Sequence, residues 1–203
     1  MPRMGLSTAH VVAAGAEFAD EFGIESVTLA ALAERLGVKP PALYKHVDSI
    51  GDLQHRIATL AMSEFGDVLG IAIQGKSGAD AISALFEAMY AYIAEHPGRY
   101  AAATNAKLQG NDDPFFVATS RVINSMRAVL TSYGIPLDER DHAIRMLRST
   151  IHGFAQFQTA NAFQWSNDPA ETVAWMIRFF DAGLKAITKS PLGPQDGSLP
   201  SNG

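Results

Sequence analysis

Residues 27–47 read Val-Thr-Leu-Ala-Ala-Leu-Ala-Glu-Arg-Leu-Gly-Val-Lys-Pro-Pro-Ala-Leu-Tyr-Lys-His-Val, and they decide the fold. Apolar residues in the first half recur at spacings of three and four, so they share one helical face. Gly37 follows where a helix C-terminus favours a residue with positive φ. Pro40 and Pro41 suit the first turn of a new helix, where a missing N–H is not needed. The pattern predicts two short helices joined by a tight turn, the layout of a helix-turn-helix.

The side chains around this turn indicate what each short helix does. Thr28 is predicted to cap the first helix through its hydroxyl. Leu43 and Val47 stand four residues apart and are expected to face inward in the second. That helix has only about two turns, too few for stability unless packing holds it. The residues on its remaining face favour a helix that contacts DNA bases. The alternative is an ordinary pair of packed helices whose outer side is only solvated. The residues left on that face are Ala42, Tyr44, Lys45 and His46.

The run from residue 32 to residue 47, preceded by an amphipathic helix and Thr28, resembles the DNA-binding domain of the TetR family of transcriptional repressors. It is most similar to the branch with Leu-Tyr-x-His-Val in the recognition helix, and the resemblance covers residues 6–62. It implies an all-helical homodimer that binds double-stranded operator DNA and is released by a small ligand.

The resemblance also implies roles for single residues. Thr28 matches the helix start that meets a DNA phosphate, and Tyr44 matches a common phosphate-contact position. Ile50 stands where the family often has a lysine, which leaves one phosphate contact of the family open. Arg3, in a short arm before the first helix, could reach DNA as basic arms do, or remain solvated. The recognition-helix residues implied to lie at DNA are Lys39, Pro40, Pro41, Ala42, Tyr44, Lys45 and His46.

Composition bounds the class of protein. The 203 residues are 47% hydrophobic and 18% charged, which suits one or two domains with a sizeable core. The absence of cysteine excludes disulfides and thiolate metal sites. No stretch approaches the roughly 18 apolar residues of a membrane span, and the N-terminus lacks a signal-peptide core. We therefore expect a cytoplasmic protein with no membrane partner.

Charge is distributed unevenly along the chain. The net charge of −5 is unfavourable for DNA binding in general. Residues 27–47, however, carry three basic residues against Glu34, a local net charge of +2. Residues 1–26 carry one basic residue against four acidic ones. We expect a small positive face that reads DNA and an acidic edge that points away from it.

The helical pattern continues to residue 188 and predicts an all-α fold of about nine helices. We expect a three-helix helix-turn-helix DNA-binding domain over residues 1–52 and a helical ligand-binding and dimerisation domain over residues 53–189. Residues 190–203 contain nine Pro, Gly and Ser residues among fourteen and are expected to be a disordered tail. Helices besides the two short ones are predicted over residues 7–22, 50–74, 79–95, 98–108, 115–133, 138–163 and 169–188.

The last two predicted helices each carry two apolar stripes, which is more than one core needs. A helix pair that meets its copy across a two-fold axis would bury the excess. The alternative is a thick monomer core, and the family resemblance favours the homodimer. The interface is predicted to contain Ile151, Phe154, Ala155, Trp175, Met176, Phe179 and Phe180.

The central helices are rich in methionine and aromatic residues, which is typical of a mainly apolar ligand pocket. Residues 148–154 also resemble the His-Gly signature of one C-terminal subtype of the TetR family. We expect the pocket to bind a small, largely apolar effector; the alternative is that these residues are simply core. The predicted pocket members are Phe86, Met89, Tyr92, Tyr100, Met126, His152 and Gln156.

Motifs for catalysis are missing from the sequence. It contains no Gly-rich phosphate loop, no His-x-x-x-His pair and no nucleophile elbow. We therefore predict no enzyme, no catalytic residue, no cofactor and no metal. The favoured hypothesis is a ligand-responsive transcriptional regulator, expected to be a repressor, that binds a palindromic operator as a homodimer. The alternative is a helical small-molecule-binding protein or enzyme that has lost operator binding, motivated by Ile50 and the acidic N-terminal balance.

Overall fold

The computed structural model describes residues 6–110, 112–164, 166 and 168–189. Over these residues the fold is all-α, as predicted, with eight α-helices and two 3₁₀ helices. The expected count of about nine omitted the short 3₁₀ helix η1. The elements are α1 (Thr8–Phe22), η1 (Ile24–Ser26), α2 (Leu29–Arg35), η2 (Pro40–Lys45), α3 (Ile50–Ile73), α4 (Gly78–Glu95), α5 (Pro97–Asn105), α6 (Pro114–Ser132), α7 (Arg140–Thr159) and α8 (Pro169–Lys189).

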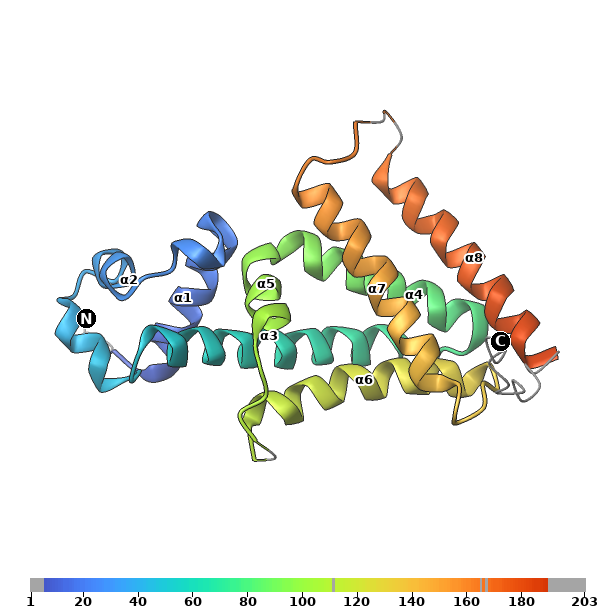
Figure 1. Ribbon diagram of the computed structural model, residues 1–203, viewed down its shortest axis with the longest axis horizontal. Coiled ribbons are helices and arrows are strands. Elements are labelled where there is room, and N and C mark those ends of the chain that lie inside the picture. Colours follow the sequence, from blue (N-terminus) through green and yellow to red (C-terminus); the bar gives the residue numbers. More distant parts are fainter. Residues whose placement is uncertain (1–5, 111, 165, 167, 190–203) are drawn as a thin grey trace, which may run out of the picture.

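The longest helix, α3, runs along the long axis of the molecule and joins its two ends (Figure 1). Its first turns pack with α1 in a head made of α1, α2 and η2. The rest of α3 packs against α4, α5 and α6 in the body, and α7 and α8 cover α4. Because α3 begins at Ile50, the expected boundary between residues 52 and 53 falls inside its first turn. One continuous helix therefore serves both parts.

The first helix begins and ends where the sequence predicts. The hydroxyl of Ser7 caps α1, and Gly23 ends it with a φ of +85°. Val11 and Ala14 are buried on the inner face of α1. Phe22, by contrast, has a side chain that is 52% exposed. Phe22 is the last helical residue, and its ring lies against that of Phe18, with 4.8 Å between centroids.

The helix-turn-helix forms for the reasons that the sequence gives. Thr28 Oγ1 accepts a hydrogen bond from the backbone N–H of Ala31 at 3.1 Å, and Gly37 adopts a φ of +65°. Leu43 and Val47 are fully buried. The second helix, η2, is a 3₁₀ helix rather than an α-helix, since its hydrogen bonds run from each N–H to the carbonyl three residues back. Its two prolines occupy the first two positions of the helix, where no N–H donor is needed.

Polar contacts fix the loops of the body. Ser49 caps α3 by accepting a hydrogen bond from the N–H of Asp52 at 3.1 Å. Asp113, a buried carboxylate, caps α6 and lies 2.9 Å from His55 Nε2 on α3. This contact holds the α5–α6 loop against the central helix. At the far end of the body, the hydroxyl of Tyr133 donates to Asp181 of α8 at 2.7 Å.

Two further expectations concern the ends of the chain and membranes. The predicted disordered tail, residues 190–203, lies outside the described residues. None of the helices in the described part of the chain is both long and apolar enough to cross a membrane.

Candidate nucleic-acid interface and cavity

The outer face of η2 is the candidate nucleic-acid interface. Leu43 anchors the helix in the core of the head, so the neighbouring side chains turn outward. Tyr44 is 59% exposed, and its hydroxyl is free to donate to a phosphate oxygen. The short side chains of η2 leave its backbone near the surface, which permits close approach to a groove. Of the predicted contact residues, Lys39, Pro40, Pro41 and Lys45 are exposed and Ala42 and His46 are half-buried.

Only part of the positive charge near η2 is available to DNA. Lys39 and Lys45 have no ion-pair partner among the described residues. Arg35, by contrast, pairs with Glu21 of α1 at 2.6 Å and stacks over the ring of Phe18. The local net charge of +2 counted for residues 27–47 therefore includes Arg35, whose charge is already paired with Glu21.

Two further positions flank this face. Thr28 uses a lone pair of its hydroxyl to cap α2, which leaves the O–H free to donate to a phosphate. Ile50 is the first residue of α3 and is 37% exposed, so an apolar side chain occupies the surface position where the family often has lysine. Arg3 lies outside the described residues.

A cavity of about 680 Å³ lies in the body, lined by α3, α4, α5, α6 and α7. Its volume is in the range of sites that bind drug-sized molecules. Met62 and Phe65 of α3 form one apolar wall. Four of the predicted pocket residues line the cavity, namely Met89, Tyr100, Met126 and His152.

The other three predicted pocket residues lie elsewhere. Phe86 is fully buried and packs against Phe180 of α8, with 5.0 Å between ring centroids. Gln156 is exposed on α7, one turn beyond the cavity. Tyr92 points into a polar cluster between the head and the body. Periodicity places Phe86, Met89 and Tyr92 on the inner side of α4, but of these three only Met89 lines this cavity.

The cavity also has a polar side that the sequence prediction missed. Arg127 of α6 and Arg145 and Arg148 of α7 line it. The spacing 145, 148, 152 along α7 is a signal that could have placed these side chains on one helical face with His152. Burial, together with the nearby charge of Arg148, lowers the pKa of His152 below its usual value. Burial raises the pKa of Tyr100, against a smaller opposite effect of Arg148.

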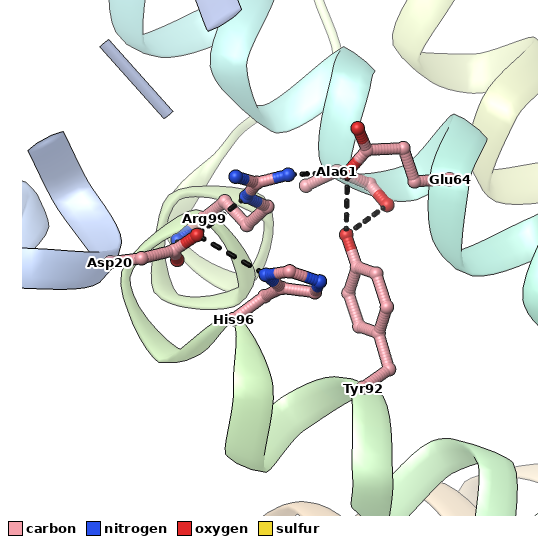
Figure 2. Close-up of polar contacts among 6 residues, drawn as sticks. All are labelled: Asp20, Ala61, Glu64, Tyr92, His96 and Arg99. Atoms are coloured by element: carbon pink, nitrogen blue, oxygen red, sulfur yellow. Dashed lines mark hydrogen bonds and ion pairs between the residues drawn. The ribbon is translucent and has the colours of Figure 1, made fainter. Parts of the chain in front are cut away.

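A cluster of polar side chains connects α1 of the head to the body (Figure 2). Asp20 of α1 accepts hydrogen bonds from the backbone N–H and from Nε of Arg99 of α5, at 2.8 and 2.7 Å. Arg99 Nη1 donates to Glu64 of α3 at 2.8 Å, and His96 Nδ1 lies 3.3 Å from Asp20. Both Asp20 and Arg99 are largely buried. Burial by itself lowers the pKa of Arg99, but the two carboxylates outweigh this effect and raise the pKa. Arg99 therefore stays charged.

Tyr92 completes this cluster from α4. Its hydroxyl lies 2.9 Å from the carbonyl oxygen of Ala61 and 3.3 Å from Glu64 (Figure 2). Burial and the adjacent Glu64 carboxylate raise the pKa of Tyr92, so the phenol remains a donor. The contact explains why Tyr92 is turned away from the cavity.

The backbones of α1 and α5 touch beside this cluster. A Cβ atom on Gly98 would lie 1.8 Å from the carbonyl oxygen of Ala19. Only glycine fits at this position, and α5 therefore packs directly on the end of α1. The same short helix carries Tyr100 and Ala103 into the cavity wall. A single helix of nine residues thus contacts both the head and the cavity.

The predicted dimer residues separate into two groups. Trp175 and Phe179 are 57% and 55% exposed on α8, and their rings stack at 5.5 Å. Met176 is half-buried against the core. The remaining four are buried within this chain, where α7 and α8 pack on α4. These four are Ile151, Phe154, Ala155 and Phe180.

No group of three or more His, Asp or Glu side chains within the described ranges is placed to hold a metal ion.

Comparison with known proteins places this geometry in a family. Residues 11–57 match the family "Bacterial regulatory proteins, tetR family", and residues 82–180 match "Tetracyclin repressor-like, C-terminal domain". The HTH-type transcriptional regulator YobS of Bacillus subtilis (strain 168) is 30% identical over 190 residues, which cover 93% of this chain and 98% of YobS. The HTH-type transcriptional regulator Rv0681 of Mycobacterium tuberculosis (strain ATCC 25618 / H37Rv) is 35% identical over 149 residues, 73% of this chain and 68% of Rv0681.

Solved structures share the fold. A protein of unknown function from Rhodococcus sp. RHA1 superposes with a TM-score of 0.76 at 21% identity, covering 91% of this chain and 99% of that one. BioQ, in complex with its double-stranded DNA operator, superposes with a TM-score of 0.60 at 20% identity, covering 90% of this chain and 99% of BioQ. The two family matches span the head and the body, and a relative is aligned over nearly the whole chain. The chain therefore belongs to the TetR family of DNA-binding, helix-turn-helix transcriptional regulators, a family that does not consist of enzymes.

Proposed function

We propose that this protein is a cytoplasmic transcriptional repressor that binds a palindromic operator as a homodimer and leaves it when a small molecule occupies the cavity. The observation that carries the proposal is the exposed face of η2, where Tyr44 lies beside the unpaired Lys39 and Lys45. The operator complex of BioQ, a protein of the same fold, supports DNA as the partner.

The charge on one head argues for two heads acting together. Each unpaired lysine that neutralises a phosphate contributes about 0.9 to the salt slope of binding. With only Lys39 and Lys45 as unpaired cations on the described part of this face, a single head has a low affinity for DNA. A two-fold dimer doubles the number of contacts and reads a palindrome with two recognition helices. The exposed pair Trp175 and Phe179 on α8 is the surface that we assign to this dimer.

Helix α5 is the element that we propose couples the cavity to the head. Tyr100 lies in the cavity wall, and two residues earlier Gly98 rests on the backbone of α1. A ligand that displaces Tyr100 would therefore move the contact made by Arg99 with Asp20. The ligand can shift operator affinity only by its preference for one of the two arrangements, typically about 1–3 kcal/mol.

A fluorescence-anisotropy titration tests operator binding. The DNA that flanks the protein's own gene is titrated with the full-length protein at several salt concentrations. We expect sequence-dependent binding that weakens as salt rises. The double variant Tyr44→Ala with Lys45→Ala should bind more weakly, with a salt slope smaller by about 1.8 for a dimer that loses two lysines.

Lys107 provides the matched control, because it is an exposed lysine in the α5–α6 loop, far along the chain from η2. Lys107→Ala should leave affinity and salt slope unchanged. If the Tyr44 and Lys45 variant binds as the wild type does, η2 is not the reading surface. If the wild type itself shows no sequence-dependent DNA binding, the result favours the second candidate, a ligand-binding protein without an operator, which the apolar Ile50 at the surface also supports.

A further inference from the structure

The cavity has one strongly basic side. Arg145, Arg148 and His152 project from the same face of α7, and Arg127 faces them from α6. The described residues that line the cavity include no aspartate or glutamate. Three guanidinium groups with no acid among the lining residues create a positive potential over this side of the cavity.

The opposite side is apolar and densely packed. Met62, Phe65, Met89 and Met126 are all buried, and they form the inner wall with the ring of Tyr100. Methionine side chains adapt to ligands of different shape, and aromatic rings supply flat apolar area. The cavity therefore has an apolar interior and a basic rim.

Several polar groups that line the cavity lack a close partner in the described part of the chain. Arg145 and Arg148 form no ion pair with any residue that the structure describes, and Arg127 has only a 3.4 Å contact with the exposed Asp141. His152 Nδ1 and Thr119 Oγ1 are inaccessible to solvent and have no hydrogen-bond partner among the residues that the structure describes. Buried polar atoms are nearly always paired in folded proteins, so each unpaired atom calls for a partner. Both of these atoms belong to residues that line the cavity.

We propose that the cavity binds an amphipathic anion, an apolar body that ends in a single carboxylate or phosphate group. This inference rests on the proposed role of the cavity as the effector site and replaces the expectation of a largely apolar effector. The head group would lie between Arg127, Arg145 and Arg148, whose planar guanidinium groups match the oxygen pairs of both anions. The apolar body would lie against Met89 and Met126. A neutral apolar ligand would leave the arginines unused.

Calorimetry on the protein tests the proposal with four probes that share a ten-carbon chain, each used below the concentration at which it aggregates. The probes are decanoate, decyl phosphate, decan-1-ol and decyltrimethylammonium. We expect decanoate, decyl phosphate or both to bind at least about tenfold more tightly than decan-1-ol, because a charge-assisted hydrogen bond contributes at least that much. The tighter of the two anions identifies the head group. Equal binding of the anion and the alcohol, preference for the cation, or no binding by either anion would each overturn the proposal.

Variants locate the anion. Arg145→Gln and Arg148→Gln should each reduce the affinity for the preferred anion about tenfold and leave that for decan-1-ol unchanged. Arg178→Gln is the matched control, because Arg178 is an exposed arginine of α8 that does not line the cavity. Loss of anion preference in the control, or its persistence in both cavity variants, contradicts the proposal. Operator binding by the ligand-free protein, measured in parallel, shows whether the proposed function fails independently.

Discussion

Arg99 of α5 donates two hydrogen bonds to the carboxylate of Asp20 of α1, one from its backbone N–H at 2.8 Å and one from Nε at 2.7 Å. This contact joins segments nearly eighty residues apart in sequence, and its two side chains are only 12% and 14% exposed. It is the main polar link between the DNA-reading head and the body.

Replacing Asp20 with Asn should destabilise the protein, because the variant leaves a largely buried guanidinium with Glu64 as its only carboxylate partner. We expect a loss of about 1–3 kcal/mol in the free energy of unfolding, measured by urea denaturation. Glu21→Gln is the matched control: Glu21 pairs with Arg35 at the surface, and removal of an exposed pair should cost less than about 1 kcal/mol. Equal losses for the two variants would show that the Asp20 contact has no special role.

Replacing Gly98 with Ala should force α5 away from α1, since the added methyl group would overlap the carbonyl of Ala19. We expect a destabilisation of at least about 1–3 kcal/mol, together with altered operator affinity. Gly70→Ala is the control, because Gly70 lies in α3 with open space around it and should gain up to about 1 kcal/mol from helix propensity. Thermal unfolding and anisotropy on both variants check this. A Gly98→Ala protein that matches the wild type in both would contradict the close contact.

Replacing Ile50 with Lys should strengthen operator binding. The side chain is exposed in the first turn of α3, at the position where the family often places a lysine near a phosphate. A dimer gains two cations, so the salt slope should become steeper by about 1.8. Ile50→Gln separates the effect of charge from the loss of an exposed apolar group. The prediction fails if the Lys and Gln variants bind DNA with the same slope.

The titration of His152 should respond to Arg148. Burial and this neighbouring cation hold the pKa of His152 below its usual value of 6.5, so the folded protein releases this proton more readily than the unfolded chain. As pH falls through 6.5, the unfolded chain takes up this proton before the folded protein does. The free energy of unfolding therefore decreases. NMR should record a higher pKa for His152 in Arg148→Gln, and no change in Arg178→Gln. An unchanged pKa in the first variant would refute the coupling.

The aromatic pair on α8 should control the oligomeric state. Trp175 and Phe179 are exposed and stacked on a helix whose opposite face is already buried against α4. Replacing both with Ala should convert a dimer into a monomer in sedimentation velocity, because interface aromatic residues often contribute about 2 kcal/mol or more each. Leu137→Ala, at an apolar side chain that is 80% exposed in the α6–α7 loop, should leave the dimer intact. A dimeric double variant would place the interface elsewhere.

The head could be predicted from sequence because its signals are local. The cap at Thr28, the positive φ at Gly37 and the buried Leu43 each depend on residues within a few positions. The cavity could not be predicted in the same way. Met89 and Phe86 share the inner side of α4, and only the packing of α8 decides that one meets Phe180 and the other meets open space. Arg127 and Arg148 are far apart in sequence and come together only when α6 lies beside α7.

The contact between Gly98 and Ala19 has a consequence for the evolution and engineering of such regulators. A chimaera that joined this head to the body of another regulator through the α3–α4 loop would keep α1 but replace α5. Any body with a side chain opposite Ala19 would collide with the head, whatever operator the head reads. Exchange of DNA specificity between family members should therefore succeed only among bodies that carry a glycine at this position. The head and the body can therefore be combined only when the surfaces of α1 and α5 fit one another.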